Sequence, residues 1–204
     1  MKPLILLPGR NGKTSLYARL RPRFPELVTP EWIEPLVDEP LANYAQRMAE
    51  TLHPQLSEGC VLGGTSFGGM VAHEMAPALG LNSCLLISTV RGPSELPANL
   101  QALRAHTQAG EAGFEGVPLL KNRFARWTAW AILTWELSPA AQSVQTWHLH
   151  GDLDSTFPIG NVHPDEIVPG GGHVLPMTHP DAVEGFLRRA HRPLLCGKIP
   201  MSSQ

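Results

Sequence analysis

The 204-residue chain carries 16 basic and 18 acidic residues, a formal net charge of −2, so we expect no nucleic-acid partner. This length suffices for one full hydrophobic core, and we expect a single domain over residues 1–204. The 19 glycines and 20 prolines exceed average usage without reaching the share typical of low-complexity chains, which predicts a globular protein rich in ordered loops.

The cysteine content and the length of the apolar runs bear on the cellular compartment of the protein. The three cysteines, Cys60, Cys84 and Cys196, are odd in number and show no C-x-x-C spacing, which suits a reducing compartment. The apolar run near the start is too short for a signal peptide, and no run approaches the ~18 apolar residues of a membrane-spanning helix. We therefore expect a cytoplasmic protein without a membrane span.

The first half of the chain alternates strand and helix patterns. Leu4–Leu7 is a continuous apolar run ended by Pro8 and Gly9, which is typical of a strand buried on both faces. The expected elements that follow are a helix over 15–20, a strand over 27–33, a helix over 41–52, a strand over 60–62, a helix over 67–79 and a strand over 83–87. This alternation predicts a mostly parallel sheet with helices on both faces.

The alternation lapses between Gly92 and Pro139, which predicts a short cap-like insertion at about residues 92–139. It resumes with strands over 144–149 and 167–168 and a helix over 180–190, and we expect a disordered tail over 194–204. Within the insertion, aromatic residues at helical spacing either pack on the sheet or line a substrate pocket. The candidate pocket residues are Phe124, Trp127 and Trp130.

The segment VLGGTSFGGM (residues 61–70) contains G-x-S-x-G at Gly64, Ser66 and Gly68, directly after a predicted strand and before a predicted helix. A serine on such a tight turn has an exposed hydroxyl, and the glycines remove Cβ atoms that would clash in the bend. The following helix directs backbone N–H groups and its positive dipole end at the same point. The pattern predicts that Ser66 is a nucleophile.

A serine nucleophile needs a base and an acid that orients the base. Asp152 and Asp154 follow a predicted strand, and His173 lies in a Gly-rich loop after the next strand. This gives the order serine, acid, histidine. His163 lies in a different loop, His179 directly precedes a proline as a helix cap would, and His148 and His150 are expected to be structural.

From its first strand to its last helix the chain resembles the α/β-hydrolase superfamily. The resemblance covers G-x-S-x-G and an acid loop H-G-x-x-D followed by proline, matched by His150, Gly151, Asp154 and Pro158. It implies Asp154 as the acid, with Asp152 as the alternative, and His173 as the base. The segment LILLPGRNG resembles relatives with a Leu-Pro-Gly oxyanion loop, which implies backbone N–H donors at Arg10 and Phe67.

Two departures from the family pattern make the chain look like a reduced member: it lacks the hairpin strands that often precede the oxyanion strand, and its cap is short. The Arg10 side chain is either an exposed loop arginine or a contact for an anionic substrate.

Two other motifs fail on their spacing. GRNGKTS imitates a phosphate-binding loop, but position 7, where that motif needs glycine, is Leu7. HLHGDLD (residues 148–154) imitates a metal-binding signature but has Leu153 where its last histidine would stand. We therefore expect neither a metal nor a cofactor.

The sequence thus predicts a serine hydrolase that cleaves carboxylic esters or thioesters of small to medium acyl groups through an acyl-enzyme. The alternative is a noncatalytic ligand-binding or scaffold protein that keeps the same fold.

Overall fold

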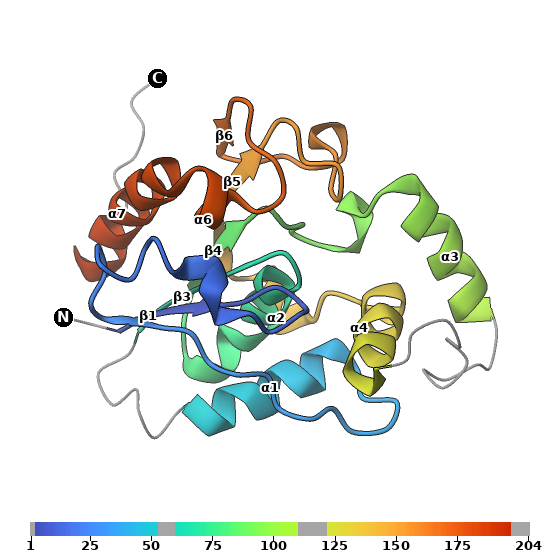
Figure 1. The fold of residues 1–204 in the computed structure, drawn as a ribbon. Coiled ribbons are helices and arrows are strands. Elements are labelled where there is room, and N and C mark those ends of the chain that lie inside the picture. Colours follow the sequence, from blue (N-terminus) through green and yellow to red (C-terminus); the bar gives the residue numbers. More distant parts are fainter. Residues whose placement is uncertain (1–2, 53–59, 110–121, 197–204) are drawn as a thin grey trace.

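A parallel sheet forms the middle of the protein in the computed structural model, which describes residues 3–52, 60–109 and 122–196 (Figure 1). Within these residues the sheet has six strands in the order β2-β1-β3-β4-β5-β6, and every neighbouring pair is parallel. The strands are β1 (Leu4–Leu7), β2 (Leu27–Val28), β3 (Val61–Thr65), β4 (Ser83–Ile87), β5 (Gln145–Gly151) and β6 (Glu166–Val168). The predicted mostly parallel sheet is confirmed.

The strand order reverses direction at β1. From β1 the chain passes to β2 on one side and then returns to β3 on the other, so that Leu4 of β1 lies opposite both Leu27 and Val61. In open parallel sheets such a reversal leaves a crevice at the carboxyl ends of the two central strands, where ligands bind. The loops that follow β1 and β3 meet there.

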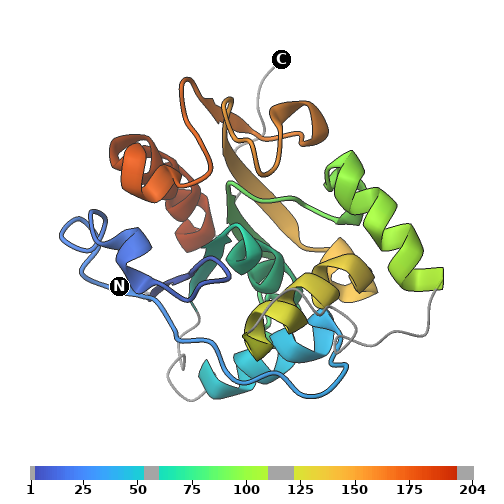
Figure 2. The ribbon, with the colours of Figure 1, turned by 45° about the vertical axis from the view of Figure 1, so that its right-hand side comes forward.

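Helices cover both faces of the sheet. The helix α1 (Leu41–Leu52) has its buried residues at helical spacing and packs with α2 (Phe67–Met75) and α4 (Arg123–Thr134) around the core on one face. On the other face lie the 3₁₀ segment η1 (Thr14–Tyr17) and the helix α7 (Pro180–Cys196). Figures 1 and 2 show α1 and α7 on opposite sides of the sheet. Because both faces are covered, every residue of β1, β3 and β4 is buried.

The remaining elements are short, apart from one helix of the insertion. They are η3 (Pro77–Leu79), η4 (Pro93–Glu95), α3 (Ala98–Ala109), α5 (Pro139–Gln142), η6 (Ile159–Asn161) and α6 (Leu175–Thr178). No helix in the described ranges is both long enough and apolar enough to cross a membrane.

Several predicted boundaries were wrong, three of them by four residues or more. The strand expected over 27–33 ends at Val28, because Pro30 has no N–H for the ladder and the chain turns away over residues 29–40. The helix expected to reach residue 79 ends at Met75, and a 3₁₀ turn starts at Pro77. The last helix continues past Pro193 to Cys196, so residues 194–196 are helical rather than disordered. Residues 197–204 of the expected tail lie outside the described part.

The insertion predicted at about 92–139 contains α3 and α4, while residues 110–121 between them lie outside the described residues. The inner face of α4 is packed into the core: Trp127, Ala131 and the adjoining Trp135 are at most 1% exposed. Glu74 of α2 fixes the end of this segment, because its Oε1 accepts hydrogen bonds from the Trp135 indole and from the Ser138 N–H.

Candidate active site

Ser66 occupies the sharp turn between β3 and α2. Its backbone has φ 58° and ψ −127°, a conformation that costs energy for any residue with a Cβ. The flanking glycines are required sterically: a Cβ on Gly64 would lie 2.3 Å from the Gly68 carbonyl, and one on Gly68 would lie 2.3 Å from the Pro8 carbonyl oxygen. The turn therefore packs tightly against the end of β1 while it holds the Ser66 side chain.

Three of the predicted side chains form a hydrogen-bonded series. His173 Nε2 lies 2.9 Å from Ser66 Oγ, and His173 Nδ1 lies 2.8 Å from Asp154 Oδ2. Since a carboxylate can only accept, the His173 Nδ1–H donates to Asp154, and the tautomer with this proton on Nδ1 presents Nε2 as an acceptor for the Ser66 hydroxyl. The His173 side chain is 24% exposed and that of Asp154 is 0% exposed, so only the histidine is open to solvent.

Asp154 is held as a charged acceptor. Its Oδ1 accepts hydrogen bonds from the N–H groups of Thr156 (2.8 Å) and Phe157 (3.0 Å). Burial alone would raise its pKa, but the bond from His173 and these backbone bonds together hold the pKa below its ordinary value. Asp152, the alternative acid, is exposed and accepts from the Gly170 N–H instead, so the structure brings Asp154 and not Asp152 to His173.

A buried histidine pair lies behind Asp154. His150 Nε2 is 2.8 Å from the Phe157 carbonyl and 3.4 Å from Asp154 Oδ2, while its Nδ1 is 3.1 Å from His148 Nε2. The Phe157 carbonyl must accept from Nε2–H, so His150 Nδ1 accepts from His148 Nε2–H. Burial lowers the pKa of His150 and lowers that of His148 to about 2. Both rings are therefore neutral.

The alternative histidines do not join this series. The His179 ring contacts the Thr178 hydroxyl, and His163 is exposed and accepts a bond from Arg91 through its carbonyl. The loops carrying the acid and His173 are bonded directly to one another, because the Leu153 N–H donates to the Gly171 carbonyl at 2.9 Å. Asp154 and His173 are thus positioned as one unit.

The loop after β1 contains Arg10, whose N–H is the second predicted oxyanion donor. Residues 9–12 form a turn closed by a 2.9 Å bond from the Gly12 N–H to the Gly9 carbonyl, with Gly12 at φ 67°. The Tyr17 hydroxyl ties the start of this loop to the strand before Ser66, since it donates to the Leu7 carbonyl (2.7 Å) and lies 2.8 Å from the Thr65 hydroxyl. Among the described residues, neither the Arg10 N–H nor the Phe67 N–H has a hydrogen-bond partner.

The three aromatic residues predicted as pocket candidates differ in position. Trp127 is a core residue whose indole N–H donates to the Glu39 carbonyl, whereas Phe124 and Trp130 are half-buried and pack against the core. Sequence reasoning missed Trp32, whose ring packs on Phe124 (6.0 Å between centroids) and Phe67 (5.5 Å). A tryptophan between Pro30 and Pro35, in a segment without periodicity, was the only available signal.

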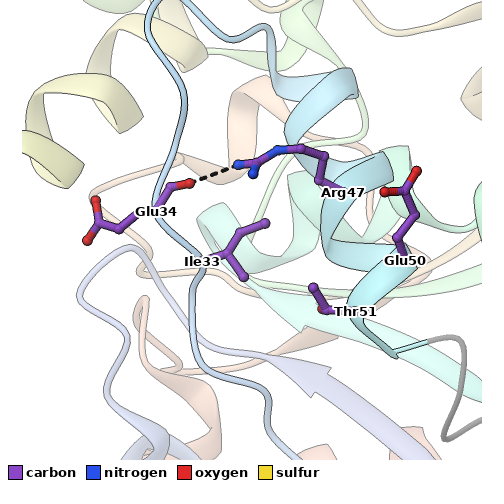
Figure 3. Close-up of a pocket in the computed structure, with 5 residues that line it drawn as sticks. All are labelled: Ile33, Glu34, Arg47, Glu50 and Thr51. Carbon is purple, nitrogen blue, oxygen red and sulfur yellow. Dashed lines mark hydrogen bonds between the residues drawn. The ribbon is translucent and has the colours of Figure 1, made fainter.

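A surface hollow of about 490 Å³ lies beside α1 and is lined by Ile33, Glu34, Arg47, Glu50 and Thr51 (Figure 3). Arg47 is already bonded to Glu39 and to the Glu34 carbonyl, and none of the lining residues belongs to the hydrogen-bonded series. Because the hollow shares no residue with that series, we place the candidate site at Ser66.

The described ranges contain no cluster of three or more histidine, cysteine, aspartate or glutamate residues arranged to hold a metal ion. In the HLHGDLD segment both His150 nitrogens and both Asp154 oxygens have hydrogen-bond partners.

No protein-family model matches the sequence, and no curated protein matches it either. Among solved structures, a thermophilic esterase from Thermogutta terrifontis is similar with a TM-score of 0.66 and 20% identity, covering 95% of this chain and 90% of that one. The thioesterase domain of NocB gives 0.58 and 21%, covering 94% and 95%, and the N-acyl homoserine lactonase AidH gives 0.60 and 15%, covering 100% and 92%. The chain therefore has the α/β-hydrolase fold.

Proposed function

We propose that the protein is a serine hydrolase that cleaves carboxylic ester or thioester bonds of small to medium acyl substrates. One observation carries the proposal: a serine on a strained strand-to-helix turn lies 2.9 Å from a histidine that lies 2.8 Å from a buried carboxylate. The similarity of the fold to an esterase and a thioesterase supports the same reaction class.

In the proposed reaction His173 Nε2 takes the proton of the Ser66 hydroxyl while Oγ attacks the acyl carbon. The resulting oxyanion accepts hydrogen bonds from the N–H groups of Phe67 and Arg10, and Asp154 stabilises the imidazolium. Collapse expels the alkoxide or thiolate, which takes the proton from His173 and leaves an acyl-enzyme. Water, deprotonated by the same histidine, then releases the carboxylic acid and regenerates Ser66.

The site favours substrates of limited size. Phe67 directly follows Ser66 and packs ring against ring with Trp32 and Phe124, which supports a restricted acyl site. We therefore expect turnover to fall as the acyl group lengthens.

Labelling with a fluorophosphonate, with the modified peptide mapped, tests the nucleophile, and p-nitrophenyl esters and acyl thioesters of increasing length test the substrate class. Ser66→Ala should abolish labelling and turnover while the circular dichroism spectrum stays unchanged. Ser15→Ala, which removes an exposed hydroxyl on η1, is the matched control and should behave as wild type. A folded protein that is not labelled at Ser66 would favour a noncatalytic binding protein instead.

A further inference from the structure

Trp32 lies where four parts of the proposed site meet. Its segment, residues 29–40, has no helix or strand, yet the indole packs against Phe67 at the start of α2, Phe124 of α4 and Tyr44 of α1. Its fourth contact is polar: the indole Nε1–H donates to the Gly9 carbonyl at 3.1 Å. The ring thus connects the loop after β1 with the residue that follows Ser66.

We propose that Trp32 is a positioning residue of the oxyanion hole, which acts by fixing the Gly9–Arg10 peptide so that the Arg10 N–H is held toward the reacting oxygen. This inference rests on the proposed function, because the oxyanion exists only in that reaction. It assigns a role to a side chain whose hydrogen bond goes to the Gly9 carbonyl and not to Ser66, His173 or Asp154.

The geometry of one peptide unit carries the argument. In a trans peptide the C=O of one residue and the N–H of the next lie in one plane and point in opposite directions, and no cis peptide occurs in the described residues. The Gly9 carbonyl is held by two donors, the Trp32 indole at 3.1 Å and the Gly12 N–H at 2.9 Å. Fixing that oxygen also fixes the direction of the Arg10 N–H, which has no partner among the described residues.

The loop lies close to the nucleophile. A Cβ on Gly68, two residues after Ser66, would contact the carbonyl oxygens of Pro8 at 2.3 Å and Leu7 at 2.4 Å. The Gly9–Arg10 peptide, whose carbonyl binds the Trp32 indole, therefore comes directly after residues 7 and 8, which pack against the turn of Ser66. Hydrogen bonds to the carbonyl also polarise the peptide, which strengthens its N–H as a donor.

The indole itself is fixed by its neighbours. It stacks on Phe124 at an interplanar angle of 26° and meets Phe67 edge-on at 62°. On the loop side, a Cβ at position 12 would lie 3.3 Å from Trp32 Cδ1, so glycine at this position lets the ring approach. A donor on a restrained ring keeps its direction through the reaction, as preorganised stabilisation of an oxyanion requires.

Two substitutions remove the N–H while keeping an aromatic ring. Trp32→Phe is the first, and site-specific replacement of Trp32 by 3-benzothienylalanine, which has sulfur in place of the N–H on a fused ring of nearly the same shape, is the second. Trp147→Phe is the matched control, because the Trp147 indole N–H has no hydrogen-bond partner among the described residues. Each protein is assayed for kcat and KM with a short ester and for inhibition by a boronic acid that forms a tetrahedral adduct.

We expect kcat to fall about threefold to tenfold in both Trp32 variants with KM unchanged, a factor that matches the loss of one hydrogen bond to a backbone carbonyl. Affinity for the boronic acid should fall by the same factor, while Trp147→Phe keeps wild-type values. The effect should stay below the ~100-fold or larger loss caused by removing an oxyanion donor, because the Arg10 N–H itself is retained.

The inference would be overturned if both Trp32 variants kept the wild-type kcat and the wild-type affinity for the boronic acid. It would also be overturned by a rise in KM at constant kcat, which would indicate that Trp32 lines the acyl pocket instead. In both cases loss of activity in Ser66→Ala leaves the proposed function standing. A wild-type protein that neither hydrolyses esters nor reacts with fluorophosphonate overturns both.

Discussion

Replacing His148 by glutamine should reduce the acid sensitivity of this fold. His148 is fully buried, and burial, with smaller contributions from His150 and Arg91, lowers its pKa to about 2 in the folded protein. In the unfolded chain the pKa of histidine is about 6.5. Below that pH the unfolded chain takes up a proton that the native protein does not, so the free energy of unfolding falls as the pH falls.

The magnitude follows from the width of this interval. Well below pH 6.5 each pH unit lowers the free energy of unfolding by about 1.4 kcal/mol for one such group; because the unfolded histidine is half protonated at pH 6.5, the loss between pH 6.5 and 4.5 is about 2.3 kcal/mol. Glutamine suits the site because its side-chain amide can donate to His150 Nδ1 as His148 Nε2–H does, and His148 Nδ1 has no partner within the described ranges.

Urea unfolding at several pH values between about 7.5 and 4.5 measures the effect, with the free energy extrapolated to zero denaturant. The wild-type curve should fall more steeply than that of His148→Gln, while His106→Gln, which removes an exposed histidine on α3, should run parallel to wild type. Parallel curves for wild type and His148→Gln would show that the native protein protonates His148, and the argument from burial would be refuted.

Three further predictions concern the surroundings of Ser66. Asp154→Asn should lower kcat by about 10³–10⁴-fold and Asp152→Asn by less than about threefold, because only Asp154 accepts a bond from His173; equal losses in an ester assay would contradict this. Gly68→Ala should lower both the melting temperature and kcat, since its Cβ would meet the Pro8 carbonyl, whereas calorimetry of Gly160→Ala, where no atom lies within 4 Å, should match wild type. Tyr17→Phe should reduce the free energy of unfolding by about 1–2 kcal/mol through loss of its bond to the Leu7 carbonyl, and an unchanged urea midpoint would show that this bond contributes nothing.

The sequence predicted most accurately the elements whose pattern of apolar residues follows directly from which of their faces are buried. Leu4–Leu7 and Ser83–Ile87 are strands with the expected bounds, because a strand covered on both faces is apolar throughout. The helix Leu41–Leu52 also has the expected bounds, since its apolar residues recur at helical spacing. For the site, motif and chain order identified Ser66 and His173, and the family resemblance selected Asp154 over Asp152; the structure brings these three side chains within hydrogen-bond distance.

Features that depend on distant contacts escaped prediction. The expected strand over 27–33 includes Trp32; Pro30 is a local sign that this strand ends early, but nothing local shows that the Trp32 indole reaches the Gly9 carbonyl. The pairing of His148 with His150 behind Asp154 depends on the path of the acid loop, which brings the Phe157 carbonyl back to His150. In both cases the missing information is the path of an irregular segment.

The residues of the proposed site lie far apart in the sequence, so the ribosome makes them at different times. Ser66 and His173 are 107 positions apart, and His173 comes after β5 and β6 have been made. At a translation rate of about 5–20 residues per second, a ribosome completes the nucleophile turn roughly 5–20 s before it makes the base. On the proposed function, a nascent chain carries an unactivated serine until its last third has docked, and the onset of the proposed ester hydrolysis would mark the completion of folding.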